Sequence, residues 1–232
     1  MKKILVTGGK SRFANVLSKI KTNHKLIYRS KSQLNIMSLN SIIKNIKTFK
    51  PNYILHLAGL SRPMKIHDND ISKSIDLNIV GTCNLVKACS KFKKKLIYFS
   101  TNYIYQGKTG NYKENDPLLP WNNYAWSKLG GESAVQMYKN SLILRVSMTE
   151  KPFVHQFAYT NVKNNFIFQE DLAKVFLKLV NQKGIINVGG LTQTVYDFAK
   201  KNNPNVKKKY SKGEFPKRVD MNLFKLKKIL KK

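Results

Sequence analysis

Short apolar runs alternate with amphipathic stretches from residue 3 to about residue 146. The apolar runs have the length of buried strands and lie at residues 3–7, 25–29, 53–57, 95–99 and 141–145. Helical periodicity separates them at residues 12–21, 39–49 and 76–92, and a further helix is expected around Tyr124 and Lys128. Because alternating strands and helices build parallel sheets covered on both faces, the pattern predicts an α/β fold.

The pattern becomes less regular after about residue 146, and no internal repeat or low-complexity linker precedes that point. We therefore expect residues 1–147 to hold most of the sheet and the reactive side chains. Residues 148–232 are expected to form a small C-terminal region that is interleaved with the end of the sheet. Ligands of such sheets bind outside the carboxyl ends of the strands.

Composition favours a packed protein in a reducing compartment. The chain has 232 residues, 42% of them hydrophobic, which suits a folded globule. Cys83 and Cys89 lack the spacing of a zinc site or a disulfide framework, so we expect no metal. The first apolar run is too short for a signal peptide, and no stretch is long enough to span a membrane. The expected location is cytoplasmic, without membrane contact.

The net charge of +31 raises the possibility of nucleic-acid binding. However, the lysines are spread over the whole length, and the only arginines are Arg12, Arg29, Arg62, Arg145 and Arg218. We therefore expect no specific nucleic-acid site, although anionic substrates should be attracted.

The residues after the first strand, 7–14, could form a turn that binds a dinucleotide. Gly8 supplies the tight turn, whereas Ser11 and Ala14 occupy positions where glycines are usual. An ordinary strand-to-helix turn is the alternative. The candidate cofactor-binding residues in this segment are Gly8, Lys10, Ser11, Arg12 and Phe13.

The end of the second strand bears on the choice of nicotinamide cofactor. An acidic residue there binds a ribose hydroxyl, while an arginine accommodates a 2′-phosphate. This chain has Arg29 and Ser30, so we expect NADP, as NADPH, to be preferred, with NAD possible. The alternative is that Arg29 is one more cation of a basic protein.

Tyr124 and Lys128 lie four residues apart, which on a helix places both side chains on one face. A fixed cation beside a phenol favours the phenolate, so we expect Lys128 to lower the pKa of Tyr124 toward the range of a general acid or base. Without other reactive groups nearby, an amphipathic helix with an exposed lysine would be the simpler interpretation.

Several spaced motifs carry a family resemblance. They are Thr7-Gly8-Gly9, His56-Leu-Ala-Gly59, Asn78-Ile-Val-Gly-Thr82, Ser100-Thr-Asn-Tyr-Ile-Tyr105 and Tyr124-x-x-x-Lys128. Together they resemble the extended short-chain dehydrogenase/reductase superfamily, and within it the dTDP-4-dehydrorhamnose reductases and related nucleotide-sugar 4-ketoreductases. The resemblance implies a Rossmann-like, doubly wound parallel sheet with a small C-terminal substrate-binding subdomain.

The resemblance also implies roles for three residues. Thr101 would hydrogen-bond the substrate carbonyl, Tyr124 would be the general acid, and Lys128 would hold the nicotinamide ribose. These roles suit the chemistry, because hydride transfer to a ketone leaves negative charge on its oxygen, which needs a hydroxyl donor and a proton.

Other roles follow by matching motifs. The implied cofactor-binding residues beyond the first turn are Asn35, Ile36, Leu57, Ala58, Gly59 and Asn78, together with Tyr124 and Lys128. Thr101, Asn102 and Arg218 are implied to bind substrate. Asn35 and Ile36 replace the usual acidic-apolar pair beside adenine, and Asn102 replaces a common aspartate. His56 is expected to be a packed strand histidine, and Arg145 to fix the end of its strand.

The expected function is NADPH-dependent reduction of the keto group of a dTDP- or UDP-linked 4-keto-6-deoxy sugar, in deoxysugar biosynthesis. The segment between Ser147 and Gln169 is short for a substrate-binding insertion, so the site could be open or completed by a partner. Alternatives are a catalytically silent dinucleotide-binding or regulatory subunit and a nucleotide-sugar epimerase or dehydratase. A homodimer is possible.

Overall fold

A computed structural model describes residues 1–231, and six strands form its central parallel sheet in the order β10-β5-β4-β3-β1-β2. The strands are β1 Lys3–Thr7, β2 Lys25–Arg29, β3 Tyr53–His56, β4 Lys95–Thr101, β5 Ser141–Val146 and β10 Gly184–Val188. The chain runs outward from β1 to β2 and then returns to the other side of β1 as β3. This reversal creates the crevice where ligands of doubly wound sheets bind, and the predicted fold class is confirmed.

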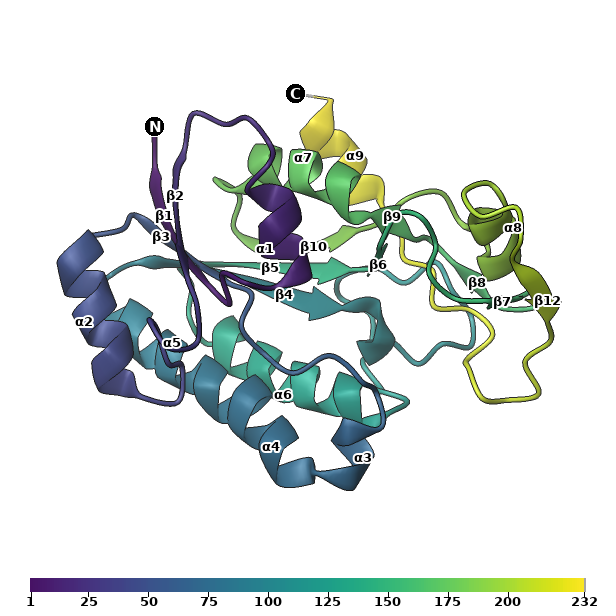
Figure 1. Cartoon of the computed structure of the whole chain (residues 1–232), viewed down its shortest axis with the longest axis horizontal. Coiled ribbons are helices and arrows are strands. Elements are labelled where there is room, and N and C mark those ends of the chain that lie inside the picture. Colours follow the sequence, from purple (N-terminus) through teal and green to yellow (C-terminus); the bar gives the residue numbers. More distant parts are fainter. Residues whose placement is uncertain (232) are drawn as a thin grey trace.

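Helices cover both faces of the sheet (Figure 1). They are α1 Arg12–Leu17, α7 Gln169–Leu179 and α9 Phe224–Leu230 on one face, and α2 Leu39–Phe49, α5 Gly81–Lys91 and α6 Asn123–Gln136 on the other. Alternate residues of β1 reach opposite cores. Ile4 and Val6 join the cluster that contains Phe176, while Leu5 joins the cluster that contains Ile42.

Two helices differ from their predicted bounds. The helix expected at residues 12–21 ends at Leu17, where turn hydrogen bonds replace the helical ones. The stretch expected as one helix at residues 76–92 begins with a π-helical turn, Asp76–Val80, before α5. Periodicity alone does not reveal such a turn, which inserts one residue into the helical hydrogen-bond pattern.

The chain from residue 148 onward contributes to two parts of the molecule, a set of small strand pairings and the main body around the central sheet. The elements β6 Met148–Thr149, β7 Phe157–Tyr159, β8 Lys163–Asn164, β9 Ile167–Phe168, β11 Gln193–Thr194, α8 Val195–Lys200 and β12 Lys207–Lys209 form small pairings beside the sheet. Their apolar cluster includes Phe153, Val162 and Phe198. In contrast, α7, β10 and α9 pack in the main body. Residues after β5 therefore contribute both to the small pairings and to the main body.

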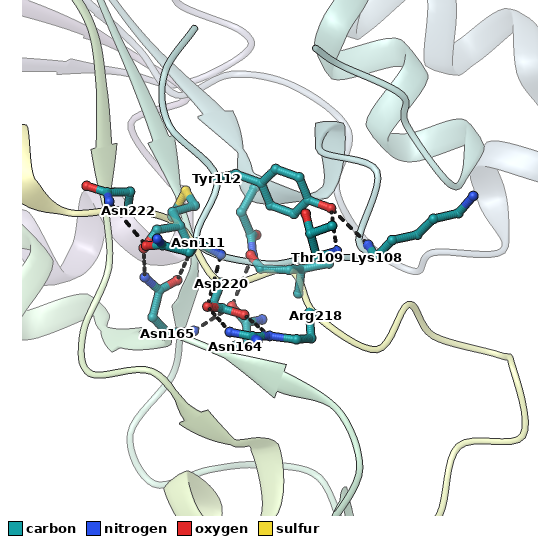
Figure 2. A network of polar contacts seen from close by, with 12 residues as sticks. Lys108, Thr109, Asn111, Tyr112, Asn164, Asn165, Arg218, Asp220 and Asn222 are labelled. Carbon is teal, nitrogen blue, oxygen red and sulfur yellow. Dashed lines mark hydrogen bonds and ion pairs between the residues drawn. The ribbon is translucent and has the colours of Figure 1, made fainter. Parts of the chain in front are cut away.

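A polar network ties residues 218–222 to the loop after β4 (Figure 2). The Asp220 carboxylate accepts hydrogen bonds from the Asn111 backbone N–H and from the Arg218 guanidinium, at 3.0–3.1 Å. The Asn165 amide donates to the Met221 carbonyl at 2.9 Å. Because Asn111 and Asn165 are far from Asp220 and Met221 in sequence, the network fixes the C-terminal segment against the chain after β4 and after β8.

Candidate functional site

A cavity of about 870 Å³ opens at the carboxyl ends of β1, β3, β4 and β5. Its lining includes Lys10, Ser11, Arg12 and Phe13 after β1, Leu57, Ala58 and Gly59 after β3, Ser100, Thr101 and Asn102 of the β4 end, Asn78, and Tyr124 and Lys128 of α6. The structure therefore brings most of the residues singled out from the sequence to one site. Its volume lies within the usual range for ligand pockets.

Gly8 begins the turn after β1, and the surrounding backbone leaves no room for a side chain at this position. Gly8 has φ 64°, and a Cβ on it would lie 2.7 Å from the Ala58 nitrogen. The Thr7 hydroxyl accepts hydrogen bonds from the backbone N–H groups of Leu57 and Ala58, at 3.2 and 3.1 Å. Ser11 caps α1 by accepting from the Ala14 N–H. Its own hydroxyl proton is not used in that bond and can be donated to a ligand.

His56 is a structural residue beneath this turn. Its Nδ1 lies 3.0 Å from the Thr7 hydroxyl, and its Nε2 lies 3.0 Å from the Thr82 hydroxyl. Burial, together with the Lys128 charge, lowers the pKa of His56 to about 3. The imidazole is therefore neutral, as expected for a packed strand histidine.

Tyr124 and Thr101 both line the cavity and lie close enough to form a hydrogen bond. Thr101 ends β4, and Tyr124 lies in the first turn of α6. Removal from water raises the pKa of Tyr124 to about 12, and Tyr103 adds to this, while a hydrogen bond with Thr101 and the Arg62 charge oppose it. The expectation that Lys128 lowers this pKa is therefore wrong, because desolvation dominates. The phenol is protonated at neutral pH.

Lys128 is itself strongly affected by its surroundings. Desolvation lowers the pKa of Lys128 to about 7, against the opposing effect of Glu132. Its ammonium lies 4.0 Å from the centre of the Tyr98 ring. The side chain can therefore change charge near neutral pH.

Asn78 joins the loop after β3 to α6 from within the π-helical turn. Its amide donates to the Leu60 carbonyl at 2.9 Å and to the Ser127 hydroxyl at 2.8 Å, and it accepts from the Leu60 N–H at 2.7 Å. Gly59, with φ 157°, passes so close that a Cβ would lie 2.8 Å from the Asn78 oxygen. This contact fixes the position of the loop after β3 against Asn78 at the cavity wall.

A buried ion pair anchors α6 to the sheet. Arg145 of β5 is 1% exposed and Glu132 of α6 is fully buried, with Nη2 and Oε1 2.7 Å apart. Arg145 also donates to the Tyr105 hydroxyl at 2.8 Å and to the Glu114 carbonyl at 2.9 Å. Burial opposes the charge of the guanidinium, but Glu132 outweighs it and raises the pKa of Arg145. Arg145 fixes its strand, as expected.

Several of the residues singled out from the sequence do not line the cavity: Gly8, Arg29, Ser30, Asn35, Ile36 and Arg218. Gly8 lies beneath it, in the turn. Arg29 lies over the Phe49 ring at 4.9 Å, while Ile36 is 4% exposed. The Asn35 side chain accepts from the Met37 N–H.

The two other implied substrate residues are engaged within the protein. Arg218 is held by both carboxylate oxygens of Asp220 (Figure 2). Asn102 reaches the cavity, but its amide donates to Asn164 at 3.0 Å and to the Val219 carbonyl at 2.9 Å. Asn102 therefore connects the β4 end to the C-terminal segment.

The sequence did not indicate three groups beside the site. Arg62 and Glu150 both line the cavity and form an ion pair. His67 is buried, with its ring centre 5.1 Å from that of Tyr124 and its Nδ1 2.7 Å from the Ser74 hydroxyl. Arg62 follows the Gly59 loop closely enough to have been a candidate, whereas no sequence spacing relates Glu150 or His67 to the site.

No helix within residues 1–231 is both long and apolar enough to cross a membrane. Over the same residues, the structure contains no cluster of three or more His, Cys, Asp or Glu side chains that could hold a metal ion. Cys83 and Cys89 are thiols.

Residues 1–188 match the family model described as the RmlD substrate binding domain. The chain is 26% identical over 193 residues to dTDP-4-dehydrorhamnose reductase of Aggregatibacter actinomycetemcomitans, covering 81% of this chain and 60% of that protein. It is 34% identical over 103 residues to methionine adenosyltransferase 2 subunit beta of Pongo abelii, covering 44% of this chain and 30% of that protein. The chain thus spans less than two thirds of either relative.

Among solved structures, dTDP-4-dehydrorhamnose reductase from Bacillus anthracis, in complex with NADP, superposes with a TM-score of 0.86. The identity is 19%, and the match covers 97% of this chain and 92% of that chain. This likeness shows a shared fold.

The ion pair beneath α6 generates a stability prediction. Glu132→Gln should leave the buried Arg145 charge uncompensated and lower the free energy of unfolding by roughly 3–5 kcal/mol. Asp171→Asn removes one carboxylate from an exposed pair with Lys174 and should cost no more than about 1 kcal/mol. Urea denaturation of both variants checks this. Equal losses would show that the buried pair does not anchor the helix.

Proposed function

The chain belongs to the RmlD substrate binding domain family, and from this premise we propose that it is an NADPH-dependent reductase of a nucleotide-linked 4-keto-6-deoxy sugar. The observation that carries the proposal is the convergence of Thr101, Tyr124 and Lys128 on one cavity beside the Gly8 turn. Such an enzyme would act in deoxysugar biosynthesis in the cytoplasm. A dTDP- or UDP-linked sugar is the proposed substrate.

The cavity wall fits a dinucleotide. Gly8 and Gly59 let the chain pass close to Ala58 and Asn78, where a Cβ would clash, and the Ser100 hydroxyl is buried at the wall without a hydrogen-bond partner in residues 1–231. The proposed binding residues are Lys10, Ser11, Arg12 and Phe13, then Leu57, Ala58 and Gly59, with Gly8 and Asn78 shaping the wall. When bound, the nicotinamide supplies the hydride.

The proposed proton donor is Tyr124. Because its pKa is raised to about 12, the phenol carries its proton at neutral pH and can give it to the ketone oxygen. Thr101 would donate a hydrogen bond to the same oxygen as negative charge develops there. Lys128 would hold the ribose hydroxyls of the cofactor.

Arg29 is proposed to favour NADPH. It ends β2, where a guanidinium can contact a ribose 2′-phosphate, and within residues 1–231 its Nε is buried without a hydrogen-bond partner. Ser30, Asn35 and Ile36 follow Arg29 along the chain and are proposed to adjoin the adenosine.

A regulatory role is the second candidate. It is favoured by the 34% identity over 103 residues to methionine adenosyltransferase 2 subunit beta, and it would require dinucleotide binding without turnover. The two candidates differ in whether Tyr124 reacts.

Tyr124→Phe should lower turnover by roughly 10²- to 10⁴-fold, because it removes the proposed general acid. The measurement is the absorbance of NADPH during incubation with dTDP- or UDP-linked 4-keto-6-deoxyglucose. Tyr210→Phe, at an exposed tyrosine outside the cavity, is the matched control and should keep full activity. Cofactor binding by the wild type without turnover would favour the regulatory candidate.

The Lys128 pKa predicts a pH dependence. Since this pKa is about 7 and the ammonium is the charged form, kcat/KM should fall as pH rises through 7. In Lys128→Arg the guanidinium stays charged, so this fall should disappear whatever the absolute rate. The check is the pH profile of both proteins between pH 6 and 9. An unchanged alkaline fall in the variant would exclude Lys128 as its origin.

Arg29→Asp should weaken NADPH binding more than NADH binding, by roughly tenfold or more, since it replaces the partner of the 2′-phosphate with a repelling charge. Fluorescence titration with both cofactors measures the ratio. The variant Lys31→Asp makes the same charge change two residues later and should alter the ratio less. Equal weakening of both cofactors by Arg29→Asp would contradict the assignment.

A further inference from the structure

Three charged side chains from separate segments meet at the cavity wall: Arg12, Arg62 and Glu150. Arg12 Nη1 lies 3.0 Å from Glu150 Oε1, and Arg62 Nη1 lies 2.9 Å from the same oxygen. Arg62 Nη2 also donates to Glu150 Oε2 at 3.2 Å. Two guanidinium groups therefore converge on one carboxylate.

The carboxylate occupies a place suited to a ligand anion. Two arginines that share one oxygen offer the forked donors that bind phosphate oxygens in pairs. Although burial opposes its ionisation, Arg62 and Arg12 lower the pKa of Glu150, so its negative charge persists at neutral pH. In a chain with 43 basic and 12 acidic residues, a carboxylate at this wall would repel the anions that the remaining surface attracts.

The arginine pair also adjoins the proposed reaction centre. Burial raises the pKa of Tyr103 and of Tyr124, and the Arg62 charge is close enough to oppose the rise in both. Arg12 is the first residue of α1, which lies on the opposite face of the sheet from α6 (Figure 1). The pair therefore spans the region between the dinucleotide turn and the candidate proton donor.

We propose that Arg12 and Arg62 form a diphosphate-binding clamp, and that Glu150 occupies this clamp until a ligand diphosphate displaces it. The inference rests on the proposed function, because both the dinucleotide and the nucleotide sugar would carry such a group. Glu150 would thus be an internal competitor that lowers the affinity for one of these two ligands. Binding of the diphosphate would exchange one set of charge-assisted hydrogen bonds for another.

The test is calorimetric titration of wild type and Glu150→Gln with three probes: NADPH, UDP and inorganic pyrophosphate. Removal of the competing charge should tighten binding of NADPH or of UDP by roughly three- to tenfold. The probe that gains identifies which ligand supplies the diphosphate. Asp171→Asn makes the same change in net charge on the exposed surface of α7 and should alter each affinity by less than about twofold.

Arg62→Gln in the Glu150→Gln background should abolish the gain, because the clamp then lacks one guanidinium. The proposal is overturned if Glu150→Gln binds neither NADPH nor UDP more tightly than Asp171→Asn does. If wild type binds neither of these two probes, the proposed function fails. The pyrophosphate titrations then decide on the clamp alone, by the same comparison of Glu150→Gln with Asp171→Asn.

Discussion

The buried pair of Arg145 and Glu132 is the contact on which the site geometry depends. Glu132 lies one helical turn after Lys128 and two after Tyr124. Its ion pair with Arg145 of β5 therefore fixes how α6 is turned about its axis and where it lies along the sheet. Arg145 extends the link through the Tyr105 hydroxyl, which in turn donates to Asn187 of β10. A buried charge needs such complete pairing, because each unpaired group would carry its full desolvation cost.

Desolvation, more than neighbouring charge, sets the chemistry of the cavity wall. It raises the pKa of Tyr124 to about 12 and lowers that of Lys128 to about 7, which moves both groups away from their charged forms. The phenol is thereby kept as a proton donor. A cation that loses its charge near pH 7 cannot strongly favour a phenolate, which explains why four-residue spacing overestimated the effect of Lys128 on its neighbour.

Contacts within one element were predictable from sequence, while contacts between distant segments were not. Every apolar run predicted as a strand lies in the sheet, because a fully buried parallel strand needs a continuous apolar run. The π-helical turn around Asn78 was not predicted. Its one inserted residue is related to the contact of Asn78 with the loop after β3, and helical periodicity carries no sign of that contact. Arg218 was chosen for its charge, but its role depends on Asp220, whose position only the folded chain determines.

The short C-terminal region still forms part of the cavity wall. Aromatic side chains from both halves of the chain form one wall, with the ring centre of Phe215 5.4 Å from that of Trp121 and 5.0 Å from that of Tyr159. Lys209 of β12 lies over the Tyr159 ring, at 5.4 Å. Since aromatic groups packed edge to face or at a tilt exclude water over a large area for few residues, a small lobe can wall a ligand site without a long insertion. A short C-terminal region therefore forms a smaller wall, but it still forms one.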